Sequence, residues 1–286
     1  MTNRDLFLAI LVPFFWAGNF VITKIATAYT PPLTLSSLLF FIVAIVLMPV
    51  MSKINIARRD IILLALLGGV FNHGLIFLGI WLGADIALSV IIIELSVPLA
   101  VFLSIILLGE KVTNIKIIGL TITIIGVVIL SGKIHSYNVI AILIMTIASV
   151  SIAILNIIVK KIGKFDVLNY LGYMAIYSLV IMLPFTIILE APSFNMITNL
   201  PHQAVYSLIY FAISMLFGVA SWFYLLQKYP VNIISPFALI APIFGIFFSY
   251  YFLNEPITAS LIIGGCIVLL GQIILIYSHK EQAPVN

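Results

Sequence analysis

Ten apolar runs, each long enough to cross a membrane, follow one another along the chain. A helix of about 20 residues crosses a hydrocarbon core of about 30 Å. The runs cover residues 6–28, 33–51, 61–82, 86–108, 114–131, 138–159, 168–189, 204–227, 232–253 and 258–277. A bilayer offers no water to backbone N–H and C=O groups, so each run must pair these groups within itself as a helix. We therefore predict an all-α integral membrane protein with ten transmembrane helices.

The composition agrees with this class, and the charges predict its orientation. The chain is 64% hydrophobic and 8% charged, whereas a soluble domain is about 25% charged. If the N-terminus is cytoplasmic, every Lys and Arg except Lys24 and Lys133 falls on the cytoplasmic side. Short cytoplasmic loops carry an excess of Lys and Arg. We predict a multi-pass protein of the bacterial cytoplasmic (inner) membrane with both termini cytoplasmic.

The chain also repeats itself at two places. At one constant offset, the second half repeats three residues of the first, pairing Glu110 with Glu255, Gly119 with Gly264 and Gly126 with Gly271. At a second offset, Asn19 and Lys24 match Asn156 and Lys161. Five helices per half is an odd number, so the halves must insert with opposite orientation. We predict two inverted five-helix repeats, residues 1–133 and 138–280, an arrangement typical of secondary transporters.

Glu94 is the residue that an apolar helix tolerates least. No charge follows it in residues 95–109. An ionised acid at the membrane centre costs roughly 2.5–3.5 kcal/mol, which favours a functional role. The repeat gives Glu94 no acidic counterpart, since residues 239–241 are apolar. Two roles stay open, binding of a substrate amine and binding of a coupling proton. A carboxylate kept protonated between helices would leave the same pattern.

Other polar and aromatic residues interrupt the runs where they could line a cavity. Trp16, Asn19 and Thr23 share one face of the first helix. The residues expected to bind substrate or proton are Glu94, Trp16, Asn19, Asn72, His73, Asn156, Trp222 and Tyr224. Interhelical hydrogen bonding is the alternative role for Asn19 and Thr23, and a satisfied buried imidazole is the alternative for His73.

Prolines and end residues complete the expected scaffold. Helix breaks or gating positions are expected at Pro98, Pro236 and Pro242. Asp85 is expected to cap the fourth helix, and Glu255 to act as a turn residue after the ninth. Further expected features are a small polar stripe of Ser214, Gly218 and Ser221, and an interfacial aromatic belt with Tyr170 and Tyr173.

Several chemistries lack a sequence signal. The chain has no glycine-rich phosphate loop and no nucleophile beside a base, so we expect neither an enzyme nor a cofactor. His73 has no second metal-ligating residue at a suitable spacing, so no metal site is expected. No basic block suggests nucleic acid. The expected partners are a small-molecule substrate and the lipid bilayer, with the protein a monomer or a homodimer.

Four segments resemble a known family. FWAGNFV at residues 15–21 with Lys24, and PPLTL at residues 31–35, are similar to the opening of EamA-type members of the drug/metabolite transporter superfamily. LLGEK at residues 107–111 and FLNEP at residues 252–256 resemble that family's recurring helix ends. The resemblance covers nearly the whole chain. It implies ten helices in two inverted repeats around a central cavity, working by alternating access.

The same resemblance bears on the substrate. Relatives include the O-acetylserine/cysteine exporter type, and others move aromatic amino acids, purines, drugs or S-adenosylmethionine. Many relatives have Arg in the second helix where this chain has Leu39. A lost cation and a gained Glu94 favour a cationic or zwitterionic substrate. We expect a secondary active transporter of small polar metabolites, amino acids or amine-bearing derivatives, with proton coupling open. The alternatives are uptake or exchange of S-adenosylmethionine, nucleosides or drugs, and, in another class, a membrane enzyme or scaffold.

Overall fold

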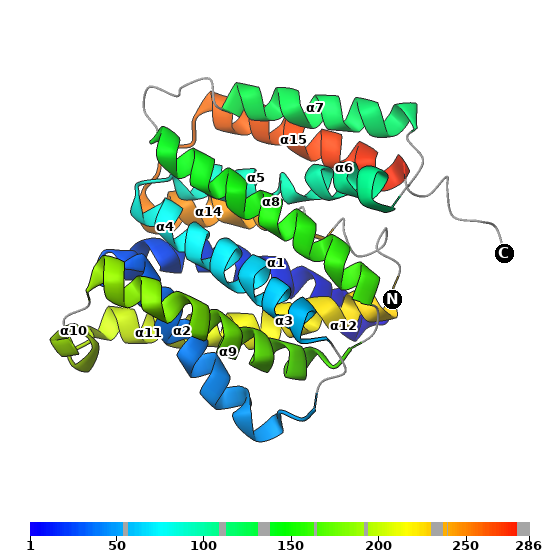
Figure 1. Cartoon of the computed structure of the whole chain (residues 1–286). Coiled ribbons are helices and arrows are strands. Elements are labelled where there is room, and N and C mark those ends of the chain that lie inside the picture. Colours follow the sequence, from blue (N-terminus) through cyan, green and yellow to red (C-terminus); the bar gives the residue numbers. More distant parts are fainter. Residues whose placement is uncertain are drawn as a thin grey trace.

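The protein is a bundle of helices that run roughly along one another (Figure 1). The computed structural model describes residues 1–53, 57–108, 113–130, 138–162, 165–191, 194–229, 237–238 and 240–278. Within these ranges all regular secondary structure is helical, and no strand occurs. Glu110 and Pro236, two residues singled out in the sequence, lie outside the described residues, as does Lys133.

The first half supplies five crossings. They are formed by α1 (Asn3–Thr27); α2 (Pro32–Leu47) with η1 (Met48–Val50); α3 (Arg58–Ala65), η2 (Leu66–Gly74) and α4 (Leu75–Trp81); α5 (Ile86–Ile93) and α6 (Ser96–Leu108); and α7 (Asn114–Leu130). The third crossing contains a π-helical segment, η2, and the fourth is interrupted between α5 and α6.

The second half supplies the other five. They are formed by α8 (Val139–Ile162); α9 (Val167–Phe185) with η4 (Thr186–Glu190); α11 (His202–Ser214), η5 (Met215–Val219) and α12 (Ala220–Lys228); α14 (Ile240–Leu253); and α15 (Ala259–Ser278). A short helix, α10 (Phe194–Thr198), connects the second and third of these. Among the described residues, six helices are long and apolar enough to cross a membrane alone, and four shorter apolar helices account for the remaining crossings.

The helix contacts show how the two halves are related. α2 packs on α9 and α7 packs on α15, so each of these helices meets its own counterpart. α1 packs on α14, and its counterpart α8 packs on α5 and α6. α1 also packs on α11, η5 and α12, just as α8 packs on η2 and α4. Exchanging the halves therefore maps these contacts onto one another, as expected for two structural repeats.

Glycines allow the α7–α15 pair to approach closely at one side of the bundle (Figure 1). A Cβ atom built on Gly126 would lie 2.7 Å from the backbone nitrogen of Val268. A Cβ atom on Gly271 would lie 2.7 Å from the backbone nitrogen of Thr123. Neither position has room for a side chain, because backbone opposes it on both helices. The repeated glycines of the sequence thus serve close packing within the chain.

Polar groups fix the α2–α9 pair at both of its ends. The Glu190 carboxylate accepts hydrogen bonds from the backbone nitrogens of Leu33 (2.8 Å) and Thr34 (2.6 Å), at the start of α2. At the other end, the Ser52 backbone nitrogen donates to Asn169 Oδ1 at 2.7 Å, and Asn169 Nδ2 donates to Ser52 Oγ at 2.7 Å. The Glu190 bonds satisfy backbone N–H groups that the start of α2 leaves free.

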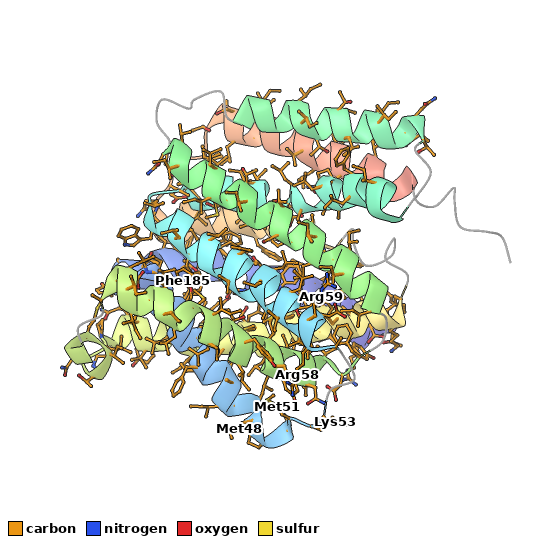
Figure 2. The ribbon with its side chains drawn as sticks, in the orientation of Figure 1. Met48, Met51, Lys53, Arg58, Arg59 and Phe185 are labelled. Atoms are coloured by element: carbon orange, nitrogen blue, oxygen red, sulfur yellow. The ribbon has the colours of Figure 1, made fainter. Side chains whose placement is uncertain are left out.

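The outer surface of the bundle is apolar, as a bilayer requires. Large apolar side chains are widely exposed on the outward faces of several helices, including Ile106, Ile188 and Phe247. Basic residues instead gather at an end of the bundle. Figure 2 shows Lys53, Arg58 and Arg59 grouped where the second crossing ends and the third begins. This division between apolar sides and charged ends is typical of a membrane protein.

Candidate functional site

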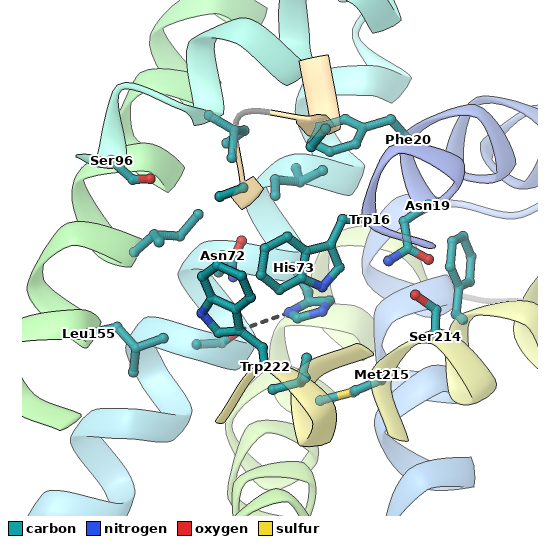
Figure 3. A pocket seen from close by; sticks show the side chains of 18 of the residues that line it. Trp16, Asn19, Phe20, Asn72, His73, Ser96, Leu155, Ser214, Met215 and Trp222 are labelled. Carbon is teal, nitrogen blue, oxygen red and sulfur yellow. Dashed lines mark hydrogen bonds between the residues drawn. The ribbon is translucent and has the colours of Figure 1, made fainter. Parts of the chain in front are cut away.

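A cavity of about 240 Å³ lies between the two halves (Figure 3). Both repeats line it, with residues from the first four crossings of one half and from α8, α9, α11, η5, α12 and α14 of the other. Of the eight residues predicted to bind substrate or proton, seven line this cavity: Trp16, Asn19, Asn72, His73, Glu94, Asn156 and Trp222. Leu39, singled out in the sequence as a departure from the family resemblance, lines it too.

Tyr224 is the exception and does not line the cavity. Two residues along an α-helix amount to about 200° of rotation, so the helix that turns Trp222 inward turns Tyr224 away. Tyr224 instead lies near the start of α1, where its hydroxyl accepts a hydrogen bond from Lys228 Nζ at 2.9 Å. Lys228 Nζ also donates a hydrogen bond to the Asp5 carboxylate at 2.8 Å, which makes the two groups an ion pair. The hydrogen bond to Asp5 raises the pKa of Lys228. The cluster joins α12 to α1.

Glu94 lies at the break in the fourth crossing. α5 ends at Ile93 and α6 begins at Ser96, and the whole Glu94 residue is only 8% exposed. Its carboxylate makes no hydrogen bond or ion pair with any residue in the described part of the chain. A buried acid normally has such a partner. The carboxylate therefore remains available to a group that enters the cavity.

Pro98 explains how the chain opens at this point. An α-helical residue at position 98 would donate its N–H to the carbonyl of Glu94, but proline has no N–H. The freed Glu94 carbonyl accepts a hydrogen bond from Gln272 Nε2 of α15 at 2.8 Å and another from the Val97 nitrogen at 3.1 Å. Pro98 itself lies in the first turn of α6, and Pro242 lies in the first turn of α14.

His73 belongs to the π-helical segment η2 and has one ring nitrogen engaged. Its Nδ1 lies 2.8 Å from the carbonyl oxygen of Gly68, drawn as a dashed line in Figure 3. A carbonyl can only accept, so Nδ1 carries the proton, and this fixes the tautomer of the neutral ring. The ring also packs edge-on against Phe40, with centroids 5.9 Å apart. Nε2 is left to act as an acceptor, so the structural and the functional roles coexist in one side chain.

Trp16 and Trp222 form an aromatic pair on the cavity wall. Their ring centroids are 5.0 Å apart, with the planes at 60° (Figure 3). Among the described lining residues the only carboxylate is Glu94, and no Lys or Arg is present. A cavity with one acid and two indole faces attracts positive charge, because the face of an aromatic ring is electron-rich.

The structure corrects two expectations about helix ends and aromatics. Asp85 makes no side-chain hydrogen bond to the start of α5; Glu255 Oε2 accepts from the Ile86 nitrogen at 3.0 Å, while its Oε1 pairs with Lys24 Nζ at 3.1 Å. Tyr170 is 1% exposed and packs against Phe223 rather than lying in an interfacial belt. Both differences arise from contacts between helices that are distant in sequence.

Sequence reasoning did not identify two residues near Glu94. Ser96 lines the cavity at the start of α6. Gln272 is fully buried in α15 and holds the Glu94 carbonyl. The signal for Gln272 was present, since it is a polar amide in an otherwise apolar run, and such residues usually bond across helices.

The comparisons with known proteins agree with this architecture. The EamA-like transporter family matches twice, at residues 4–132 and 139–277. The chain is 26% identical to a probable amino-acid metabolite efflux pump of Salmonella typhimurium, over 99% of this chain and 98% of that protein. It is 29% identical to an uncharacterized transporter of Bacillus subtilis, over 99% of this chain and 93% of that protein.

A solved crystal structure shares the fold. It superposes with a TM-score of 0.65 at 17% identity and covers 96% of this chain and 99% of its own. This likeness concerns the fold alone. The family match, in contrast, spans both halves of the sequence, and it agrees with the ten crossings and the paired helix contacts. The chain therefore belongs to the EamA-like transporter family and is a multi-pass membrane transporter.

Proposed function

We propose that this protein is a secondary transporter of small amine-bearing metabolites, amino acids among them, and that it works by alternating access. Glu94 holds one positive charge in the central cavity, either the ammonium group of the substrate or a coupling proton. A single observation carries the proposal. The Glu94 carboxylate is buried on the cavity wall and has no partner in the described part of the chain.

The chemistry of the cavity supports a cationic or zwitterionic substrate. Leu39 stands where the family resemblance leads us to expect Arg in many relatives, so the described lining offers no cation to a carboxylate. It offers Glu94 and the faces of Trp16 and Trp222 to a positive charge. Drug-sized ligands occupy pockets of about 300–1,000 Å³. The cavity measures about 240 Å³, which favours a metabolite over a drug. The name of the Salmonella relative, an amino-acid metabolite efflux pump, points the same way.

The proposed orientation has both termini in the cytoplasm of a bacterium and the bundle in its inner membrane. It is supported by the basic group of Lys53, Arg58 and Arg59, which cytoplasmic loops favour. In this orientation the Lys24–Glu255 ion pair lies at the periplasmic end of α1, and the Asp5–Lys228 ion pair lies at the cytoplasmic end.

The test compares wild-type protein with Glu94→Gln in proteoliposomes, using radiolabelled amino acids. Two rates are measured, uptake driven by a pH gradient and exchange of labelled for unlabelled substrate without a gradient. Removing the partner of a buried charge costs enough to lower uptake by about 100-fold or more. If Glu94 binds the substrate ammonium, both rates fall. If it carries the coupling proton, exchange survives and only gradient-driven uptake is lost.

Asp60→Asn is the matched control, because it removes one carboxylate from the first turn of α3, away from the cavity. It should leave both rates unchanged. Wild-type uptake by a well-expressed Glu94→Gln protein would contradict the proposed role of Glu94. Absence of saturable exchange of any amine-bearing compound by the wild-type protein would contradict the proposed substrate class.

A further inference from the structure

Two buried polar atoms on the cavity wall have no hydrogen-bond partner in the described part of the chain. They are Asn19 Oδ1 on α1 and Ser214 Oγ at the end of α11. Ser214 is fully buried. Figure 3 shows both side chains at the same edge of the cavity, apart from Asn72 and Ser96. Buried polar atoms are rarely left unpaired in proteins, so each unpaired atom calls for a specific explanation.

Another serine on α11 shows the hydrogen bond that Ser214 could have made. Ser207 donates its hydroxyl to the carbonyl of Gln203, four residues earlier, at 2.7 Å. Thr23 does the same on α1, bonding the carbonyl of Asn19 at 2.7 Å. This back-bond is the usual solution for a hydroxyl in a helix. Ser214 does not make it, and the π-helical segment η5 begins at the next residue.

The indole N–H of Trp16 lies at the same place. A Cβ atom built on Gly218 would lie 3.3 Å from Trp16 Nε1 and 3.9 Å from Ser214 Oγ, so the two groups converge over this glycine. Trp16 Nε1 makes no hydrogen bond within the described residues. Any larger residue at position 218 would push against the indole. The edge of the cavity thus offers two donors, Trp16 Nε1–H and Ser214 O–H, beside one acceptor, Asn19 Oδ1.

We infer that Trp16, Asn19 and Ser214 form a subsite for the α-amino-carboxylate head group of an amino acid. The indole N–H and the serine hydroxyl donate to the carboxylate, and Asn19 Oδ1 accepts from the adjacent ammonium. A head group of this kind carries donor and acceptor atoms side by side, which matches the subsite. It also needs no cation, because its own ammonium balances its carboxylate, and this agrees with Leu39 on the cavity wall.

The subsite rests on the proposed function and makes it narrower. α1 contacts both parts of the cavity wall, since it packs on α5 and also on α11 and η5. Glu94 follows α5, and Ser214 ends α11. Ser96, two residues after Glu94, lies apart from Asn19 and Ser214 in Figure 3. The subsite holds the α-ammonium together with the carboxylate and so selects amino acids over simple amines. Glu94 then holds the other positive charge, a coupling proton or a second ammonium group of the substrate.

The experiment compares amino acids with the amines formed by removing their carboxylate, such as phenylalanine with phenethylamine and cysteine with cysteamine. Dissociation constants are measured by thermal shift on the purified full-length protein and by competition for exchange in proteoliposomes. Ser214→Ala should raise the dissociation constants of the amino acids by about tenfold or more, because it removes a hydrogen bond to a charged group. The matching amines should bind as they do to wild type. Trp16→Phe, which keeps a ring but loses the N–H, should have the same selective effect.

Ser207→Ala is the control on the same helix, because its hydroxyl already bonds its own backbone. It should change neither class of ligand. The subsite would be overturned if Ser214→Ala and Trp16→Phe weakened the binding of amino acids and amines equally, or weakened the binding of neither. Exchange by the wild-type protein would still support the proposed function in that case. If the wild-type protein neither binds nor exchanges any of these compounds, the subsite and the proposed function are overturned together.

Discussion

The fourth and ninth crossings are counterparts in the two repeats. Each has a proline in the first turn of a helix, but the residues four positions before the two prolines differ. Pro98 lies in the first turn of α6, and Pro242 lies in the first turn of α14. Four residues before Pro98 stands Glu94, whereas four residues before Pro242 stands Ala238. Both Glu94 and Ala238 are buried and line the cavity. The inverted repeat thus supplies a symmetric scaffold, and the charge is placed in only one half of it.

The two crossings also interact directly. α5 packs on α14, where Gly245 makes room for Val90; a Cβ atom at position 245 would lie 2.8 Å from Val90 Cγ2. Glu255, just after α14, accepts from the Ile86 nitrogen at the start of α5. One counterpart therefore caps the other. The comparison teaches that repeat symmetry governs packing, while function depends on the residues that break the symmetry.

The largest effect is expected from Gln272→Leu, which removes the side chain that bonds the Glu94 carbonyl. Loss of a buried hydrogen bond should lower the free energy of unfolding by about 1–3 kcal/mol. Pro98→Ala supplies a new N–H four residues after Glu94, so the cost of Gln272→Leu should shrink in that background. Unfolding of the four proteins in a double-mutant cycle measures the coupling. Additive effects would show that Pro98 does not govern this carbonyl.

A smaller effect is expected at Asp85, where the ninth crossing caps the fourth. Burial raises the pKa of Asp85, the nearby Glu255 raises it further, and Lys24 lowers it. A raised pKa means that the folded protein binds the proton more tightly than the unfolded chain. Ionised Asp85 therefore lowers the stability of the folded protein. This loss of stability is absent at a pH below the ordinary pKa of 3.8 and complete at a pH above the folded-state pKa. Asp85→Asn should raise the melting temperature at neutral pH.

The same reasoning predicts that this gain disappears as the pH falls below 3.8, where Asp85 is protonated in both states. Melting temperatures of both proteins across pH test the point. Asn is a suitable replacement because Asp85 makes no side-chain capping bond that it would lose. A gain that is independent of pH would show that charge is not its cause.

The smallest effect is expected from Pro242→Ala. The new N–H can bond the carbonyl of Ala238, which extends the hydrogen-bond ladder of the helix without disturbing an acid. We expect the exchange rate in proteoliposomes to stay within about twofold of wild type and stability to change by less than about 1 kcal/mol. A large loss of exchange would instead support the gating role predicted for Pro242 from sequence. Pro98 and Pro242 would then both be needed for transport.

Much of the cavity could be predicted because polar residues are conspicuous in an apolar chain. Trp16, Asn19, Asn72 and Glu94 interrupt long apolar runs, and a membrane helix turns such residues toward the protein interior. Tyr224 was predicted to line the cavity together with its near neighbour Trp222. Only Trp222 does so, because Tyr224 lies on the other face of the same helix. Sequence proximity could not show which of the two faced inward, since both are aromatic side chains that carry one polar group.

The sequence by itself determined the ten crossings, because a bilayer leaves helices as the way to pair the backbone of each apolar run. It also determined the two halves and their inversion, through the repeated residues and the odd number of helices per half. Only the tertiary structure decided which polar atoms keep a partner. Gln272 Nε2 donates to the Glu94 carbonyl, and the Ser207 hydroxyl donates to its own backbone. Gln272 Oε1, Ser214 Oγ and the Glu94 carboxylate have no partner among the described residues. Those outcomes depend on distances between helices far apart in the chain, which periodicity and composition do not contain.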